Sequence, residues 1–200
     1  ELDLSFQARA APMPQGELGF SRKGPGAAQA SYYYSRPQLE VGGALVLGGR
    51  RLPVRSGRAW LDHEWSSEVL DAQAVGWDWA GLNLDDGSSL MAFRIRHRDA
   101  TTLWSHARWL PADAPALTPR FEVVRRWRSA RSGGAYPVSM RIGGGGRLLE
   151  LQPLFDDQEL DARASTGGFY WEGAVRDSEQ GRTIGRGYLE LTGYASPLRL

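Results

Sequence analysis

Residues 75–97 read VGWDWAGLNLDDGSSLMAFRIRH, and this stretch decides the fold class. Two runs rich in aromatic and aliphatic residues, Val75–Leu84 and Leu90–His97, flank the short polar sequence Asp85-Asp86-Gly87-Ser88. Acidic residues followed by glycine between two such runs are typical of a tight turn that joins antiparallel strands. The stretch therefore predicts a β-hairpin.

The same pattern recurs from this hairpin to the C-terminus. Strand-like runs alternate with turn sequences such as Gly143–Gly146 and Asp177–Gly181, and the one weak helix signal lies at Asp156–Ala164. Eight antiparallel strands can close into a barrel with room for one small ligand. We expect such a barrel over residues 71–200. The expected strands are Val75–Leu84, Leu90–His97, Leu103–Trp109, Arg120–Trp127, Tyr136–Ile142, Arg147–Pro153, Phe169–Arg176 and Arg182–Tyr194.

The first part of the chain predicts a second and smaller set of strands. Leu2, Leu4 and Phe6 alternate with polar residues, as in a half-buried strand. Tight turns are expected at Val41–Ala44 and Leu47–Arg50. This set holds about four or five strands, too few to close a barrel. Because the chain begins within a strand, we expect an incomplete first domain; the alternative is one large β-sandwich.

The composition excludes several function classes. The chain of 200 residues carries 24 basic and 23 acidic side chains, so a net charge of +1 gives no reason to expect nucleic acid as a partner. The absence of cysteine removes disulfides, thiol nucleophiles and thiolate metal ligands. The apolar runs are far shorter than the ~18 residues typical of a transmembrane segment, so none is expected in this chain. The oligomeric state stays open.

Eight blocks of sequence, taken together, resemble one family. The blocks are Ala30–Ser35, Ser56–Ser66, Gly76–Trp79, Arg126–Ser129, Tyr136–Val138, Asp157–Leu160, Tyr170–Ala174 and Gly185–Tyr194. In this order they are similar to the lipocalin-like AttH family, which shares a superfamily with carotenoid 1,2-hydratases. The resemblance implies an all-β fold of two tandem lipocalin-like barrels. We place the incomplete first domain, which lacks its N-terminal part, at residues 1–70 and the second at residues 71–200.

The resemblance also implies a class of function. Family members with known chemistry add water to an isolated C=C bond of a carotenoid, and related fungal enzymes hydrate or cyclise other hydrophobic molecules. The expected ligand is a lipophilic small molecule such as an isoprenoid, without a cofactor, and the expected activity is that of a hydro-lyase. A non-catalytic carrier of such a ligand and a structural role in the cell envelope are the alternatives. The resemblance alone favours a periplasmic or envelope location.

The densest set of reactive side chains lies in the segment Trp60–Trp65. Because side chains alternate along a strand, Asp62 and Glu64 point to one face and His63 to the other. These three side chains do not converge on one metal ion without a bulge, so no metal site is expected. A carboxylic acid in an apolar pocket can stay protonated at neutral pH. It could then protonate a C=C bond while indole rings stabilise the carbocation.

The candidate catalytic residues are Asp62, His63 and Glu64, and the candidate ligand-binding residues are Trp60, Trp65, Trp77, Trp79 and Glu172. The alternative for the first three is a structural role, tying one barrel to the next. A core or inter-domain seam is the alternative for Trp77 and Trp79. The His-x-Trp pair that matters in the hydratases resembles His63 and Trp65, but the strand Leu90–Arg96 lacks the Tyr and Asp of those enzymes, which argues against a carotenoid substrate.

Several charged residues in the later part of the chain are candidates for buried ion pairs or for an exposed basic patch. Glu172 and Glu190 are expected to face the barrel interior, where a buried carboxylate needs a partner such as Arg176 or Arg186. The most basic patch comprises Arg125, Arg126, Arg128 and Arg131. This patch predicts a solvated loop, and the alternative is a site for an anionic ligand group.

Overall fold

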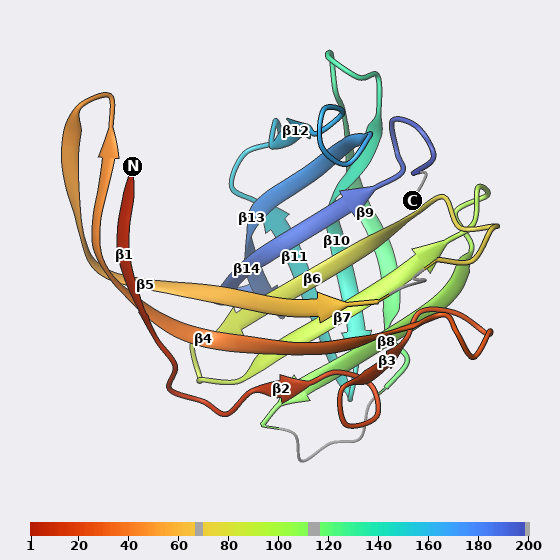
Figure 1. Ribbon diagram of the computed structural model, residues 1–200, viewed down its shortest axis with the longest axis horizontal. Helices are drawn as coiled ribbons and strands as arrows, with labels where there is room; N and C mark the ends of the chain where they lie inside the picture. Colours follow the sequence, from red (N-terminus) through yellow and green to blue (C-terminus); the bar gives the residue numbers. More distant parts are fainter. Residues whose placement is uncertain (67–69, 112–116, 199–200) are drawn as a thin grey trace.

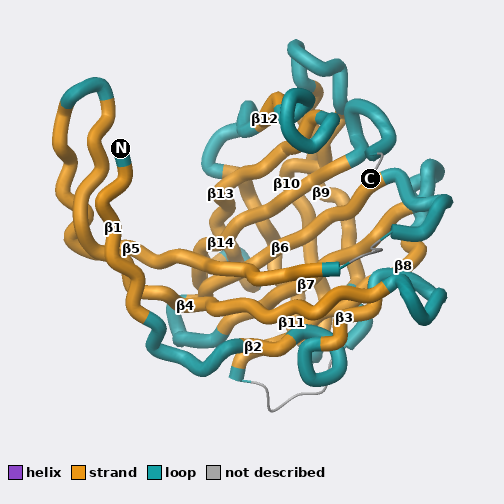
Figure 2. Tube along the Cα trace, in the orientation of Figure 1, coloured by secondary structure: helices purple, strands orange, loops and turns teal. Residues whose placement is uncertain are grey.

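The computed structural model describes residues 1–66, 70–111 and 117–198, which form an all-β protein without a helix in these ranges. The strands make two antiparallel sheets (Figure 1 and Figure 2). Sheet A consists of β1 (Leu2–Gln7), β2 (Met13–Pro14), β3 (Phe20–Arg22), β4 (Ala30–Leu47) and β5 (Arg50–Trp65). Sheet B consists of β6 (Gly76–Leu84), β7 (Ser89–Arg96), β8 (Thr102–Leu110), β9 (Arg120–Arg128), β10 (Ala135–Gly144), β11 (Arg147–Pro153), β12 (Glu159–Asp161), β13 (Phe169–Glu179) and β14 (Arg182–Thr192).

Sheet B curls around an apolar interior (Figure 2). Its strands follow the order β8-β7-β6-β14-β13-β11-β10-β9, and β12 pairs with β13. The eight long strands coincide with the eight that the sequence predicted, which confirms the all-β, lipocalin-like fold class. Leu82, Trp171 and Leu189 point inward and are fully buried in the core. At the open side, Ala107 of β8 forms an isolated bridge with Leu117, which precedes β9.

Sheet A lies against the outer face of sheet B. The strands β4 and β5 cross over β6 and β7, and their far ends extend with β1 beyond sheet B (Figure 1). Met13 and Tyr33 of sheet A pack against Met91, Phe93 and Ile95 of β7. Every residue of β7 is therefore buried, one face in the curled interior and the other beneath sheet A. That the two sheets are separate domains, divided near residue 70, stays a prediction.

The β4–β5 hairpin corrects one expected turn. Its reversal lies at Gly48-Gly49, within the predicted turn Leu47–Arg50. The turn predicted at Val41–Ala44 is wrong, because β4 runs through this segment without reversal. Gly43 adopts a φ of 130°, and a Cβ built on it would lie 2.2 Å from the carbonyl oxygen of Asp3. Glycine at this position therefore serves the close approach of β1 to β4.

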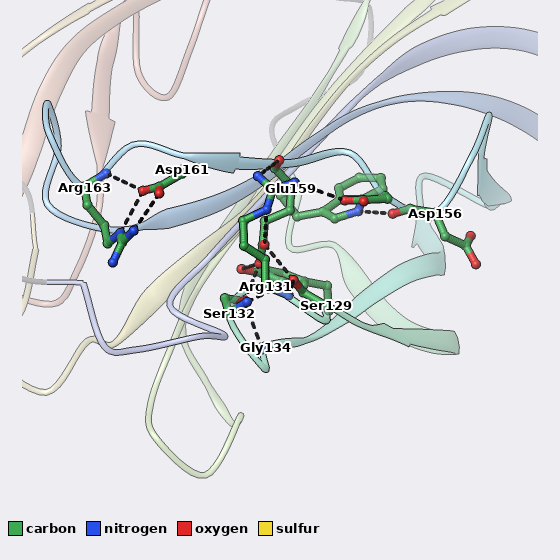
Figure 3. A network of polar contacts seen from close by, with 11 residues as sticks. Ser129, Arg131, Ser132, Gly134, Asp156, Glu159, Asp161 and Arg163 are labelled. Atoms are coloured by element: carbon green, nitrogen blue, oxygen red, sulfur yellow. Dashed lines mark hydrogen bonds and ion pairs between the residues drawn. The ribbon is translucent and has the colours of Figure 1, made fainter.

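The short strand β12 replaces the helix predicted at Asp156–Ala164. Ser129 Oγ donates to Glu159 Oε2 at 2.6 Å, and Tyr136 Oη donates to Oε1 at 2.8 Å (Figure 3). Ser132 also donates to this buried carboxylate. The helix prediction is wrong because these long-range partners hold Glu159 against the β9–β10 turn, while the backbone of β12 pairs with β13.

One buried carboxyl in sheet B leads to a stability prediction. Asp177 is fully buried, and neither of its oxygens accepts a hydrogen bond from the described residues. Burial, with a smaller contribution from the charge of Asp85, raises the pKa of Asp177 to about 8. In the unfolded chain this carboxyl ionises above pH of about 4, so its contribution to stability falls as pH rises from there to about 8.

We expect Asp177→Asn to raise the free energy of unfolding at pH 8 by roughly 1–3 kcal/mol. The neutral amide occupies nearly the same volume as the carboxyl. It also removes the free-energy cost of holding, in the folded protein, a proton that the unfolded chain releases at pH 8. Urea unfolding at pH 5 and pH 8 measures the effect, and the gain is expected to be larger at pH 8. An equal change at both pH values would contradict the assigned pKa.

Candidate active site

A cleft of about 1390 Å³ lies between β5 and the outer face of sheet B. One wall comes from β5, which forms an edge of sheet A, and the other from β6, β13 and β14. Side chains of β5 that point toward sheet B therefore meet the outward side chains of sheet B across this space. Segments far apart in the sequence contribute to a single site.

Two indole rings form the apolar wall of the cleft. Trp60 of β5 and Trp79 of β6 contact each other edge to face, with ring centroids 6.0 Å apart. A Cβ on Gly81 would lie 2.5 Å from Trp79 and 2.9 Å from Trp60, so glycine at this position lets both rings lie on the sheet. Trp79 Nε1 also donates to Tyr33 Oη at 2.9 Å, which fixes the ring.

Asp62 lines the same cleft beside Trp60. Its Oδ1 accepts hydrogen bonds from Ser35 Oγ at 2.5 Å and from Trp60 Nε1 at 2.9 Å. Behind it, Gln15 Nε2 donates to Ser35 Oγ at 3.0 Å. Desolvation by the surrounding protein raises the pKa of Asp62, against the opposing effect of these hydrogen bonds. Asp62 makes no ion pair with an arginine or lysine of the described ranges.

Glu190 of β14 faces the same cleft from sheet B. Trp77 Nε1 donates to Glu190 Oε1 at 3.0 Å. Burial raises the pKa of Glu190 to about 7, and the negative charges of Glu172 and Asp62 contribute to the shift. Glu172 lies opposite Glu190 on β13 and accepts a hydrogen bond from Tyr188 Oη at 3.1 Å. The site therefore contains carboxyls that repel one another and lie in a desolvated environment.

The position of Glu172 and Glu190 corrects the prediction that they face the barrel interior. The inward face of β13 and β14 is occupied by Trp171, Leu189 and Leu191, so the intervening glutamates point outward. Neither glutamate forms an ion pair with an arginine of the described residues. The sequence pattern placed Glu190 on the wrong face of sheet B because it did not predict which face would be covered by sheet A.

The other predicted residues of β5 lie outside the cleft. Glu64 forms an ion pair with the buried Lys23 at 2.8 Å and accepts a hydrogen bond from Ser31 at 2.5 Å. His63 Nδ1 lies 3.2 Å from Tyr34 Oη on the opposite face of β5, and its ring contacts Trp65. The cleft thus brings Trp60, Asp62 and Trp79 together with Glu190. Trp77 and Glu172 do not line the cleft but lie next to it, Trp77 donating to Glu190 and Glu172 accepting from Tyr188. The structure does not bring His63, Glu64 or Trp65 into this group.

The end of the cleft farther from Asp62 carries basic side chains. Arg58 donates hydrogen bonds to Gln38 Oε1 and to the carbonyl oxygen of Leu84. Arg186 lines the cleft and makes no hydrogen bond or ion pair with a described residue. The cleft therefore has a basic region and an acidic, tryptophan-lined region.

The described ranges contain neither a candidate membrane-spanning helix nor a metal-binding cluster. No helix there has both the length and the apolar character needed to cross a membrane. In the same ranges, no group of three or more His, Asp or Glu side chains is placed to hold a metal ion. The side chains that line the cleft include carboxyl, phenol, indole, guanidinium, amide and hydroxyl groups.

The curled antiparallel sheet, covered on one face by a second sheet, defines a lipocalin-like protein. The sequence profile of the AttH-like family matches residues 1–194, and the chain therefore belongs to the AttH-like family. This result confirms the resemblance found in the sequence blocks.

Two solved structures are similar to this chain. A Nitrosomonas europaea protein assigned as an AttH is 51% identical over 96% of this chain, with a TM-score of 0.92. Kievitone hydratase from Nectria haematococca is 19% identical over 96% of the chain, with a TM-score of 0.73, and shares the fold. The present chain spans 62% and 61% of the lengths of these two proteins. A comparison with curated proteins finds no match.

Proposed function

We propose that the cleft is the active site of a hydratase that adds water to a C=C bond of a hydrophobic small molecule, of the isoprenoid class. The observation that carries this proposal is that two desolvated carboxyls, Asp62 and Glu190, line one cleft beside Trp60 and Trp79. Such a pair can divide acid and base roles. The kievitone hydratase neighbour adds support for hydratase chemistry on this fold.

In the proposed reaction, Glu190 gives its proton to one carbon of the double bond. The cation at the neighbouring carbon lies against Trp60 and Trp79, whose ring faces stabilise positive charge. The hydrogen bonds to Asp62 favour its ionised form, and it accepts a proton from the attacking water. The product gains one hydrogen and one hydroxyl. The proton on Asp62 returns to Glu190 through solvent in the cleft, which restores both carboxyls.

A carrier protein for a lipophilic ligand is the second candidate. The observation that favours it is that Asp62 already accepts hydrogen bonds from Ser35 and Trp60, as expected of a structural carboxylate. The carrier function does not explain why Asp62 lines the open space of the cleft, whereas Glu64 forms an ion pair with Lys23 outside it. The enzyme proposal therefore accounts for more of the site.

The test is incubation of the full-length protein with a lipophilic extract in heavy-oxygen water, followed by mass spectrometry. A product with heavy oxygen in a new hydroxyl is expected. The Asp62→Asn/Glu190→Gln double variant, which preserves the shapes of both side chains, is expected to bind the same molecule without converting it. Recovery of only unmodified ligand from the wild-type protein would favour the carrier, and equal conversion by the double variant would refute this site.

A further inference from the structure

A buried charge cluster at the end of sheet B carries more positive than negative charge. Arg94 Nε donates to Asp78 Oδ2 at 2.6 Å, and Arg96 Nε donates to Asp78 Oδ1 at 2.9 Å. The Asp78 side chain is fully buried, and the side chains of Arg94 and Arg96 are only 10% and 3% exposed. One carboxylate thus faces two guanidinium groups in a region where unpaired charge is costly.

The immediate neighbours compensate only part of this excess. Tyr194 Oη donates to Asp78 Oδ1 at 2.9 Å, and its ring lies 3.9 Å from the guanidinium carbon of Arg96. Arg96 Nη2 donates to the carbonyl oxygen of Thr192, whereas its Nη1 has no hydrogen-bond partner among the described residues. The ring of Phe121 lies 5.2 Å from the guanidinium carbon of Arg94. A full negative charge is still missing from the cluster.

A pocket of about 320 Å³ opens directly onto Arg96. Arg98, Arg126 and Tyr194 also line it, together with small and apolar residues of the segment that follows β14. No carboxylate stands among its described lining residues, and Arg98 makes no side-chain hydrogen bond or ion pair within the described ranges. Arg126 donates to the carbonyl oxygen of Ala135 at 3.1 Å, which holds it at the rim.

We propose that this pocket binds an oxyanion, a phosphate, sulfate or carboxylate group, between Arg96, Arg98 and Arg126. The bound anion supplies the charge that the buried cluster lacks, and guanidinium groups bind oxyanions through paired hydrogen bonds. The pocket shares no lining residue with the cleft of Asp62 and Glu190, so this inference does not depend on the hydratase proposal. It also assigns Arg126, a member of the basic patch noted in the sequence, to a ligand site.

Titration calorimetry tests the proposal, with inorganic phosphate, sulfate and acetate added separately at constant ionic strength set by chloride. We expect saturable binding of at least one of these anions to the wild-type chain. The anion with the highest affinity shows whether the pocket prefers a tetrahedral oxyanion, such as phosphate or sulfate, or a carboxylate such as acetate. Absence of saturable binding in all three arms would overturn the proposal.

The variants leave the buried cluster intact. Arg98→Gln/Arg126→Gln removes two exposed rim charges and is expected to weaken binding about 10- to 100-fold, because each lost group donates a charge-assisted hydrogen bond. Arg182→Gln removes one exposed charge from the β13–β14 hairpin and is expected to bind like the wild type. Equal affinity of the double variant and the wild type, or an equal loss in Arg182→Gln, would refute the assigned pocket.

Discussion

Glu190→Gln is expected to lower turnover about 10²- to 10⁴-fold, the usual contribution of a general acid. Burial and the nearby charges of Glu172 and Asp62 raise the pKa of Glu190 to about 7. The carboxyl therefore keeps its proton below that pH and loses it above, so the wild-type rate is expected to fall as pH rises through about 7. Glutamine resembles the protonated side chain in shape and still accepts from Trp77, but it has no acidic proton to give.

The measurement is the pH profile of product formation on the substrate found by mass spectrometry. In Glu190→Gln, the residual activity is expected to lack the fall above neutral pH, a change that a merely structural role would not produce. Glu179→Gln is the matched control, because Glu179 lies on the same sheet in an ion pair with Arg147. A Glu190→Gln variant with the wild-type rate and profile would remove Glu190 from the reaction.

Asp78→Ala is expected to lower the free energy of unfolding by about 3–5 kcal/mol, because it leaves two buried guanidinium groups without their carboxylate. Arg94 and Arg96 each donate to a different oxygen of Asp78, so both lose their partner at once. Urea unfolding followed by tryptophan fluorescence measures the change.

Two further variants support the interpretation of that measurement. Asp161→Ala removes a carboxylate from the exposed pair with Arg163 and is expected to change stability by about 1 kcal/mol or less. Asp78→Asn retains one acceptor oxygen, so its free energy of unfolding is expected to lie between those of Asp78→Ala and the wild type. This variant keeps the test usable if the alanine variant does not fold. Equal effects of the alanine variants at positions 78 and 161 would show that the buried cluster has no special role.

The prediction of strands and faces succeeded where the pattern was local. Alternation along β5 correctly placed Asp62 on one face and His63 on the other, because side-chain direction in a strand depends only on position. The helix predicted at Asp156–Ala164 failed for the opposite reason. The backbone of this segment pairs with β13, and the Glu159 carboxylate accepts a hydrogen bond from Ser129, 30 residues earlier in the chain. Local propensity carries no information about such distant partners.

The amino-acid sequence by itself determined the all-β class, the eight long strands of sheet B and the alternation of side chains between the two faces of each strand. The physical reason is that period-two alternation and turn residues act over a few neighbouring positions. Only the tertiary structure decided that Asp62 shares a cleft with Glu190 and that the outer face of sheet B lines this cleft. Trp77 and Glu190 lie 113 residues apart in sequence, and they meet because β6 pairs with β14 beneath sheet A, an arrangement set by packing between distant segments.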